Sequence, residues 1–436
     1  MTTFADLGLP PAIVNVLSKQ GITEPFPIQK AAIPDALAGQ DVLGRGPTGS
    51  GKTFTFGLPM LARLASAPSS PGHPRGLVLA PTRELAAQIR ERLEDPAAAL
   101  GLRVLDVVGG VNINHHIRSL ASPVDLLVAT PGRAEDLINQ KKLFFDAVEI
   151  TALDEADQMA DMGFLPQVRK LLDRTPKDGQ RLLFSATLDG DVEKLITRYM
   201  HDPVTHSTAP VQAAVDTMDH YRLLVGGREE RNEIALQIAA REGKTIMFMR
   251  TKHGVDRQVK KLRRAGIQAQ GLHGDKGQGA RTRALEGFAD GSTAVLVATD
   301  IAARGIDVDD VSLVVHVDPP AEHKAYLHRA GRTARAGTSG TVVTLVMDDQ
   351  TKEVAQLLRK AGVNAPEVRV DPLSESLVTI TGARKPEGAP LPPPGQPRRT
   401  KKPAASGNRS RNANRGGGNN RSRARRSDRS RRSNGR

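Results

Sequence analysis

Cysteine is absent from all 436 residues, so disulfide bonds and thiolate metal sites are excluded. Long apolar stretches are missing as well, because no segment approaches the roughly 20 apolar residues that a bilayer span requires. The N-terminal sequence MTTFADLGLP lacks both the charged start and the apolar run of a signal peptide. These absences predict a soluble cytoplasmic protein with no membrane partner.

Positive charge is scarce outside the C-terminal end, although the formal net charge of the chain is +14. Residues 384–436 contain 17 Lys and Arg and two acidic residues, whereas the rest of the chain contains 45 basic and 46 acidic residues. The basic character therefore belongs to the tail. A nucleic-acid groove in the remainder must be formed by a local arrangement of charges and not by a generally basic surface.

Short apolar runs alternate with helical stretches in both halves of the chain. Each run is rich in Val, Leu or Ile and ends in a polar turn, as is typical of buried parallel strands joined by helices. The runs lie at 41–44, 76–81, 102–108, 125–130, 149–154 and 181–187, and then at 245–250, 294–300, 311–318 and 340–346. The pattern predicts an α/β fold with two doubly wound parallel sheets.

Two domains of ordinary size fit this length. We expect a first domain at 1–207, a linker at 208–218 and a second domain at 219–372. Beyond Thr381 the chain becomes proline-rich and then rich in Arg, Ser, Asn and Gly. Residues 384–436 lack the apolar anchors that offset the ordering entropy of folding, so we expect a disordered basic tail.

A complete G-x-x-x-x-G-K-[ST] sequence stands at residues 46–53, after a short apolar run and before a helical stretch. In such a loop the backbone N–H groups surround phosphates, Lys52 reaches the β- and γ-phosphates, and the Thr53 hydroxyl binds Mg²⁺. The expected nucleotide-binding residues of the loop are Thr48, Gly49, Ser50, Gly51, Lys52 and Thr53.

Acidic residues follow another apolar run, at Asp154-Glu155-Ala156-Asp157. A phosphate-binding loop needs an acidic group at the end of a second strand to hold its metal ion. Asp154 is expected to hold Mg²⁺ through water, and Glu155 to orient and deprotonate an attacking water. Together the two segments predict hydrolysis of a nucleoside triphosphate.

The tetrapeptide at 154–157 is the signature of the DEAD-box helicases, and other segments resemble the remaining motifs of that family in order. The chain resembles a bacterial-type DEAD-box ATP-dependent RNA helicase of superfamily two, which implies two RecA-like domains. Segment 21–29 resembles the Q motif, which implies that Gln29 reads the adenine edge and selects ATP over GTP. Phe4 stands 17 positions before Gly21, where the family carries an aromatic residue that packs on adenine.

The resemblance also implies contacts to RNA, both single-stranded and in short duplexes. Segments 81–86, 109–110 and 130–133 resemble the RNA-contact motifs of the family's first domain, and 278–281 and 298–307 resemble motifs of its second domain. The implied RNA-binding residues are Pro81, Thr82, Arg83, Gly109, Gly110, Thr130, Pro131, Gly132, Arg133, Gln278, Arg281 and Thr299.

Other segments resemble the elements that connect ATP to RNA. Segment 185–187 is similar to the family's coupling element, and 328–335 resembles its arginine motif. The resemblance implies that Arg332 and Arg335 are arginine fingers that complete a catalytic set with Lys52, Asp154 and Glu155, and that Asp307 lies near the ribose. The implied coupling residues are Asp157, Ser185, Thr187, His328 and Arg329.

Four residues depart from the family pattern: Gly46, Pro47, Ala330 and Ala334. Ala334 replaces a glycine, which permits a backbone angle that alanine resists. Arg329 either contacts phosphate or forms an ion pair with the acidic motif of the other domain. His115-His116 is expected in a surface turn near the RNA path and not in a metal site, since no further ligands accompany it.

The predicted function is ATP-driven separation of short RNA duplexes or remodelling of RNA–protein complexes. We expect a monomer that acts in ribosomal or RNA-decay assemblies. A DNA helicase is the alternative within this class, because both nucleic acids present phosphates. An RNA-annealing chaperone that depends on the tail is the alternative from another class. The tail at 384–436 is either an electrostatic RNA tether or a solubilising appendage.

Overall fold

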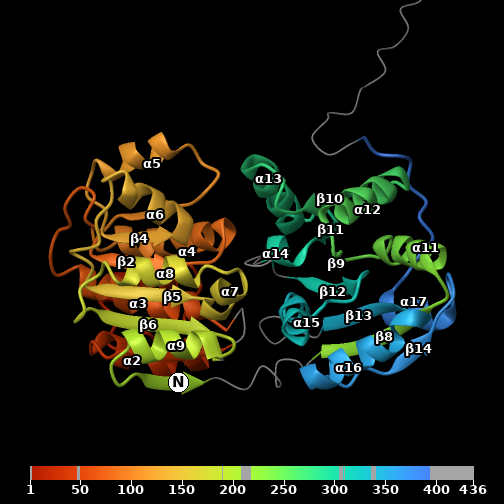
Figure 1. The fold of residues 1–436 in the computed structure, drawn as a ribbon, viewed down its shortest axis with the longest axis horizontal. Coiled ribbons are helices and arrows are strands. Elements are labelled where there is room, and N and C mark those ends of the chain that lie inside the picture. Colours follow the sequence, from red (N-terminus) through yellow and green to blue (C-terminus); the bar gives the residue numbers. More distant parts are fainter. Residues whose placement is uncertain are drawn as a thin grey trace, which may run out of the picture. The chain divides into compact units, whose positions relative to one another are not determined.

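The computed structural model describes residues 2–46, 50–188, 190–207, 218–303, 308, 310–334 and 340–392. The described residues form two seven-stranded sheets, one before residue 208 and one after residue 217 (Figure 1). All pairings between the strands of these sheets are parallel. The predicted α/β fold with two doubly wound, RecA-like domains is confirmed. Residues 393–436 of the predicted basic tail lie outside the described residues.

The first sheet has the strand order β3-β4-β2-β5-β6-β1-β7. Its first six strands in sequence coincide with the apolar runs, whereas β7 was not predicted as a strand of this sheet. The strands are β1 (Val42–Arg45), β2 (Gly76–Leu79), β3 (Val104–Val107), β4 (Leu126–Ala129), β5 (Ile150–Asp154), β6 (Gln180–Ser185) and β7 (Val204–Ser207).

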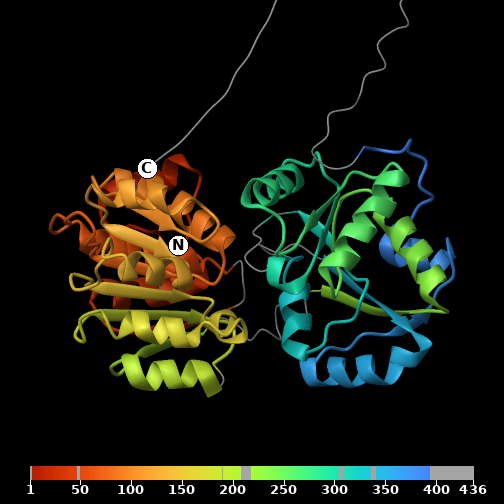
Figure 2. The ribbon, with the colours of Figure 1, turned by 45° about the horizontal axis from the view of Figure 1, so that its top comes forward.

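Helices cover both faces of the first sheet (Figure 2). Several begin at residues that suit a helix start: Pro11, Pro27 and Pro131 need no backbone N–H partner in the first turn. The helices are α1 (Pro11–Lys19), α2 (Pro27–Leu37), α3 (Lys52–Leu64), α4 (Arg83–Ala98), α5 (Ile113–Leu120), α6 (Pro131–Asn139), α7 (Ala156–Asp161), α8 (Leu165–Leu172) and α9 (Gly190–Tyr199).

The second sheet has the order β10-β11-β9-β12-β13-β8-β14, which repeats that of the first sheet with β8 in the place of β1. The two domains therefore share one topology. The strands are β8 (Met218–Val225), β9 (Lys244–Phe248), β10 (Ala269–Leu272), β11 (Val295–Ala298), β12 (Val311–His316), β13 (Gly340–Met347) and β14 (Glu367–Arg369).

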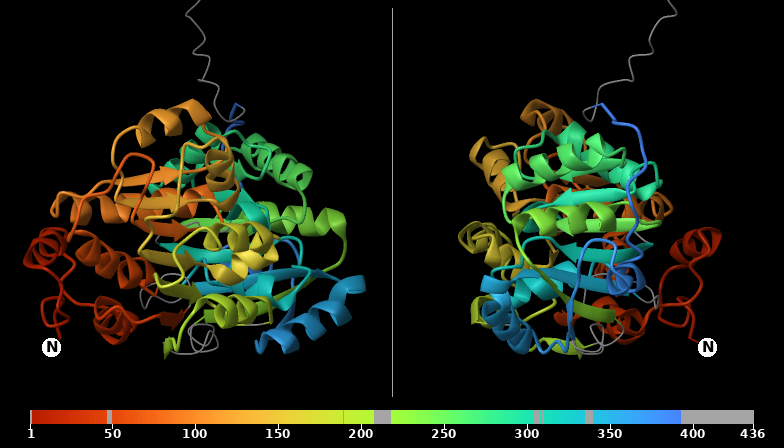
Figure 3. Two further views of the ribbon diagram at one scale, coloured as in Figure 1. Left: turned by 60° about the vertical axis from the view of Figure 1, so that its left-hand side comes forward. Right: turned by 90° about the vertical axis from the view of Figure 1, so that its right-hand side faces the viewer.

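The second domain continues past residue 372. Leu377 of its last helix is fully buried in the core, and an extended segment, described as far as Pro392, then runs along the domain towards α12 (Figures 1 and 3). The N–H groups of Arg384 and Leu391 donate to carbonyl oxygens of the second domain, so the prediction that the disordered tail begins at residue 384 is wrong. The helices are α11 (Arg228–Ala239), α12 (Lys252–Arg264), α13 (Gln278–Ala289), α14 (Asp300–Ala303), α15 (His323–Ala330), η1 (Asp348–Gln350), α16 (Thr351–Ala361) and α17 (Glu375–Thr381).

Each sheet separates two apolar cores because successive side chains of a strand point to opposite faces. In β2, Leu77 and Leu79 join the core on one face, whereas Val78 and the following Ala80 join the core on the other. All four side chains are fully buried. A strand buried on both faces reads as a continuous apolar run, which is why the interior strands could be recognised from the sequence.

Candidate functional site

The predicted motifs of the first domain lie along the edge of its sheet that is formed by the carboxyl ends of the strands. Parallel strands end at the same edge, so the residues that follow them come together. In the order of the strands β3, β4, β2, β5, β6 and β1, this edge carries Gly109-Gly110, Thr130, Pro81, Asp154, Ser185 and Gly46. The residues predicted to contact RNA thus occupy one half of the edge, and those predicted to bind the nucleotide occupy the other half.

The second domain places its predicted RNA residues in the same way. Gln278 and Arg281 follow the edge strand β10, and Thr299 follows its neighbour β11. Because the two sheets share one strand order, these positions correspond to those after β3 and β4 in the first domain. Each domain therefore offers predicted RNA contacts at the equivalent half of its sheet edge.

The phosphate-binding loop joins β1 to α3. Lys52 is buried at the start of α3, and its Nζ donates a hydrogen bond of 2.9 Å to the carbonyl oxygen of Gly46. Gly51 has φ +89°, a left-handed conformation that favours glycine. Ser50 and Thr53 are half-buried beside it. The predicted Pro47, Thr48 and Gly49 lie outside the described residues.

Gln29 of α2 ties this loop to the segment before α2. Its Oε1 accepts the N–H of Phe26 at 2.8 Å, and its Nε2 donates to the carbonyl oxygen of Gly51 at 3.0 Å. A Cβ atom at Gly51 would lie only 2.7 Å from Gln29 Nε2, so the close approach requires glycine. The side chain that was predicted to read adenine is therefore also a bridge to the phosphate-binding loop.

Two phenylalanines of the N-terminal segment differ in exposure. Phe4, which was predicted to pack on adenine, is 2% exposed and lies in the apolar core of the first domain. Phe26 is 44% exposed, and its ring lies 2.9 Å from the position that a Cβ of Gly51 would take. Pro25 and Pro27 flank Phe26, and Pro27 restricts its backbone, which is extended with ψ 158°. An aromatic residue between two prolines was the sequence signal for this exposed ring.

The acidic pair lies at the end of β5. Asp154 is buried, and this burial, opposed by the positive charge of Lys52, raises its pKa to about 7. Glu155 has φ +52°, a left-handed conformation that costs a residue other than glycine about 1–2 kcal/mol. The carboxylate of Asp154 accepts the N–H of Glu155 at 3.0 Å and so helps to hold this turn. Strained backbone of this kind clusters at functional sites.

Asp157 forms a buried hydrogen-bond network with the end of β6. Its N–H donates to Ser185 Oγ at 3.2 Å, and its Oδ2 accepts the N–H of Thr187 at 3.0 Å. His328 Nε2 of the second domain lies 3.9 Å from the same carboxylate. Burial alone would raise the pKa of Asp157, but His328, Lys52 and Thr187 outweigh it and hold the pKa well below its usual range. Four of the five predicted coupling residues are thus brought together.

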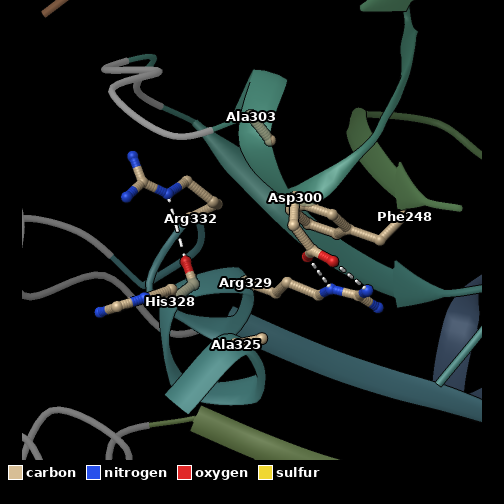
Figure 4. Close-up of a pocket in the computed structure, with 7 residues that line it drawn as sticks. All are labelled: Phe248, Asp300, Ala303, Ala325, His328, Arg329 and Arg332. Carbon is tan, nitrogen blue, oxygen red and sulfur yellow. Dashed lines mark hydrogen bonds and ion pairs between the residues drawn. The ribbon is translucent and has the colours of Figure 1, made fainter. Parts of the chain in front are cut away.

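Arg329, the fifth, has a partner within its own domain. Its Nη2 donates to Asp300 Oδ2 at 2.8 Å, its Nη1 donates to the carbonyl oxygen of Asp318 at 2.8 Å, and its guanidinium lies 5.0 Å from the ring centroid of Phe248 (Figure 4). The hypothesis of an ion pair with the acidic motif of the first domain is therefore wrong. These charge-assisted hydrogen bonds of the Arg329 guanidinium stabilise the second domain.

Arg332 and His328 extend away from the pair of Arg329 and Asp300 (Figure 4). The Nε of Arg332 donates to the carbonyl oxygen of His328 at 3.3 Å. The cavity among these side chains measures only about 10 Å³, so it is a packing gap and not a ligand pocket. The predicted Asp307 and Arg335 lie outside the described residues.

The backbone next to Arg332 is left-handed. Ala334 has φ +52°, so the position where the family resemblance expects glycine does adopt an angle that alanine resists. Thr333 holds this turn, because its hydroxyl donates to the carbonyl oxygen of Val311. By contrast, Ala330 ends the regular helix α15 and is fully buried.

Nine of the twelve residues predicted to contact RNA line one cavity of about 390 Å³, whereas Gly110, Gln278 and Thr299 do not. Those that line it are Pro81, Thr82, Arg83, Gly109, Thr130, Pro131, Gly132 and Arg133 of the first domain and Arg281 of the second. Arg83 lies over Gly110, where a Cβ would come within 1.9 Å of its Nη1. Glu84 Oε1 and Arg281 Nε form a buried ion pair of 2.7 Å, and Glu84 was missed by the sequence analysis.

Arg133 is engaged inside the first domain. Its guanidinium donates to the carbonyl oxygen of Val111 at 3.0 Å and lies 2.8 Å from His116 Nδ1. His116 is buried in α5, so the prediction of a surface turn at this residue is wrong. Burial, together with the charges of Arg133 and His115, lowers the pKa of His116 to about 4, which keeps the ring neutral and able to accept this hydrogen bond.

Among the described residues, His, Asp and Glu form no group of three or more that could hold a metal ion by themselves. A metal at the acidic pair would therefore need oxygen ligands from the nucleotide as well, as Mg²⁺ commonly has. None of the helices in the described part of the chain is long and apolar enough to cross a membrane.

Two family models match the chain. The DEAD/DEAH box helicase model matches residues 26–195, and the helicase conserved C-terminal domain model matches residues 230–337. A solved structure of Saccharomyces cerevisiae Dbp5 bound to RNA and ADP BeF3 superposes with a TM-score of 0.77 at 27% identity, covering 88% of this chain and 99% of that chain. The likeness extends over both domains.

Curated relatives share more than a third of their aligned residues with this chain. The mitochondrial DEAD-box ATP-dependent RNA helicase 9 of Arabidopsis thaliana is 37% identical over 390 residues, which are 87% of this chain and 63% of the relative. DEAD-box ATP-dependent RNA helicase CshA of Bacillus cereus is 37% identical over 379 residues, which are 86% of this chain and 71% of the relative. The chain thus spans less than two thirds of the plant relative. With both family models and these relatives, the chain belongs to the DEAD-box ATP-dependent RNA helicase family.

Proposed function

We propose that this protein hydrolyses ATP to separate short RNA duplexes or to remodel RNA–protein complexes. The observation that carries the proposal is the division of one sheet edge into an RNA half and a nucleotide half. Asp157, Ser185 and Thr187 connect the acidic motif of the nucleotide half to the neighbouring strand. A change at the γ-phosphate can therefore be transmitted through a rigid hydrogen-bond network and not only through a mobile side chain.

Adenine recognition follows from the hydrogen-bond donor and acceptor of Gln29 that its two bonds leave unused. An amide has two donors and two acceptor sites, and the bonds to Phe26 and Gly51 use one of each. The remaining acceptor suits the N6 amino group of adenine, and the remaining donor suits N7. Guanine presents O6, an acceptor, in place of the amino group and would oppose the Gln29 oxygen. The exposed ring of Phe26 is in a position to stack on the base.

Hydrolysis requires a water, a base and positive charge around the phosphates. We assign Glu155 as the base: the water oxygen bonds to the γ-phosphorus, the bond from phosphorus to the β,γ-bridging oxygen breaks, and a water proton passes to the carboxylate. Lys52 neutralises the β- and γ-phosphates, and Arg332 and Arg335 meet the charge that develops on the γ-phosphate. The Thr53 hydroxyl and the Asp154 carboxylate offer hard oxygen ligands that fit Mg²⁺, which would neutralise phosphate charge when bound.

RNA binding and ATP binding should favour each other. Predicted RNA contacts come from both domains, and so do the groups around the ATP phosphates. Each ligand therefore favours the arrangement in which the domains meet, and linkage makes the effect reciprocal. The DNA-helicase alternative predicts that DNA has the effect expected here of RNA. The annealing-chaperone alternative predicts that ATP and RNA do not affect each other's binding.

The test is ATP hydrolysis with and without single-stranded RNA, for the wild type and for Glu155→Gln. We expect RNA to stimulate hydrolysis and the substitution to lower the stimulated rate by about a hundredfold or more. Matched RNA and DNA duplexes distinguish the two helicase hypotheses. Absence of hydrolysis, together with annealing that depends on residues 384–436, would refute the proposal in favour of the chaperone.

A further inference from the structure

Helix α12 concentrates positive charge in an otherwise balanced body. Its 13 residues, KHGVDRQVKKLRR, contain six Lys and Arg and one Asp. Residues 1–383 as a whole carry 45 basic and 46 acidic side chains, so this helix stands out from its surroundings. A local cluster of cations on a near-neutral domain is the electrostatic footprint of a polyanion site.

One side of α12 lines a groove of about 470 Å³, which we call the α12 groove. The edge strand β10 forms a second wall, and the extended C-terminal segment contributes a third. The lining residues are Asp256, Val259, Lys260, Arg263, Arg264, Gln270, Gly271, Lys276, Ala280 and Leu391. Four of these are cations and one is an acid.

The cations of the groove are poorly neutralised. Asp256 lies 2.8 Å from Lys276 and 3.2 Å from His273, so one carboxylate serves both. Lys260 and Arg264 are exposed and have no carboxylate partner among the described residues. Arg263 donates to the carbonyl oxygen of Pro392 at 2.7 Å and to no carboxylate in that part of the chain. The groove therefore holds three positive charges without counterions from the described protein.

The groove adjoins the cavity of the predicted RNA contacts. The turn between β10 and α13, together with the start of α13, separates the two: Lys276 and Ala280 line the groove, while Gly274 and Arg281 line the cavity. A strand that leaves the cavity over this turn would meet the groove next. This continuity favours a nucleic acid over an acidic protein as the anion.

The C-terminal segment is fastened at the mouth of the groove. The N–H of Leu391 donates to the carbonyl oxygen of Arg263 at 2.8 Å. Gly388 packs on Gly266 so closely that a Cβ at Gly266 would lie 2.3 Å from it. The next 44 residues, 393–436, contain 15 Lys and Arg and one acid. Their charge repels that of the groove, so the chain's own tail does not suit it as an occupant.

We propose that the α12 groove binds the phosphate backbone of a single RNA strand that continues from the predicted RNA-contact cavity over the turn before α13. The proposal rests on the proposed function, since the strand is the RNA on which the helicase acts. It lengthens the RNA site of the second domain by the phosphates that Lys260, Arg263 and Arg264 neutralise. Binding there is independent of base identity.

The test compares two double variants of the full chain. Lys260→Ala/Arg264→Ala removes two charges that line the groove. Arg257→Ala/Lys261→Ala removes two charges from the same helix, also four residues apart, that do not line it. All variants keep the same tail, and so its contribution to affinity is common to them.

Affinity is measured against salt for single-stranded RNAs of about 6 and about 20 nucleotides. For the long RNA, the slope of log K against log salt should become shallower by about 1.4 in the groove variant, because each of the two lost phosphate contacts contributes about 0.7. At 0.1 M salt this change corresponds to a roughly 25-fold loss of affinity. The control variant should bind the long RNA like the wild type, and both variants should bind the short RNA equally.

Equal losses in the two variants would overturn the groove and leave only a general electrostatic effect. A second outcome would also overturn the groove as an RNA site. If both variants bind RNA like the wild type, and if the wild type captures a polyglutamate peptide that Lys260→Ala/Arg264→Ala no longer captures, the groove binds an acidic protein. The proposed function fails separately, if RNA does not stimulate ATP hydrolysis in the wild type. Thermal unfolding of each variant checks that the substitutions leave the fold unchanged.

Discussion

Replacement of Ala334 by glycine should stabilise the second domain. Ala334 has φ +52°, and its side chain is half-buried beside the core of that domain. The turn cannot relax to another angle easily, because Thr333 is bonded to Val311 and because Gly340 packs directly against Thr333. A glycine would adopt the same backbone without steric strain.

Three effects set the magnitude for Ala334→Gly. Relief of the left-handed strain contributes about 1–2 kcal/mol, while the greater freedom of glycine in the unfolded chain costs about 0.4–1 kcal/mol. Removal of a half-buried methyl group costs about 0.4 kcal/mol. The net effect is a stabilisation of about 0.5 kcal/mol. At Ala330, which is helical and fully buried, the same substitution has no strain to relieve and should cost about 2 kcal/mol.

Calorimetric unfolding of the full chain is the suitable assay, because the protein has no tryptophan to report on folding. The contrast of about 2.5 kcal/mol between the two variants corresponds to about 5–10 °C in Tm for a domain of this size. Ala334→Gly should raise the Tm slightly, and Ala330→Gly should lower it. Equal losses at both positions would refute the reasoning, since they would mean that the left-handed Ala334 carries no strain.

Three further predictions concern the first domain. Phe26→Ala should weaken ADP binding at least about fivefold without changing the affinity for tripolyphosphate, and Phe144→Ala, the other exposed phenylalanine, should change neither; an equal loss for tripolyphosphate would exclude base stacking. Because the pKa of His116 is lowered to about 4 from 6.5, the unfolded chain takes up this proton first, so stability should fall as the pH drops from 6.5 towards 4. His116→Asn should reduce that slope in urea unfolding, and an unchanged slope would assign it to other groups. Gly44→Ala would place a Cβ 2.3 Å from the buried ring of Phe184 and should cost about 1–3 kcal/mol in the same assay; wild-type stability would show that the ring moves aside.

Apart from β8, which lies outside the predicted apolar runs and is only partly buried, the interior strands could be predicted from the sequence, whereas three edge strands could not. Strands such as β4 and β11 have all four residues buried and read as continuous apolar runs. The edge strands β7, β10 and β14 read as VTHS, AQGL and EVR, with alternating or partial burial. A strand with a neighbour on only one side buries less, so its sequence carries less of the apolar signal.

Site positions could be predicted better than site contacts. The motifs follow strands, so their places along the sheet edge follow from topology. The partner of a particular side chain depends on residues that are distant in sequence. Arg329 pairs with Asp300 of its own domain, and Phe4 lies in the core, which no local pattern indicated.

The double role of Gln29 has a consequence for how a wrong base is rejected. Its amide joins the base-reading segment to Gly51, which lies 22 residues away in the phosphate-binding loop. A base that displaces this amide would also disturb the carbonyl that anchors the loop next to Lys52. Selectivity should therefore appear in turnover as well as in binding, so that saturating GTP would not restore the rate seen with ATP. In kinetic terms, recognition of the base contributes to correct placement of the phosphates for hydrolysis, and not only to binding affinity.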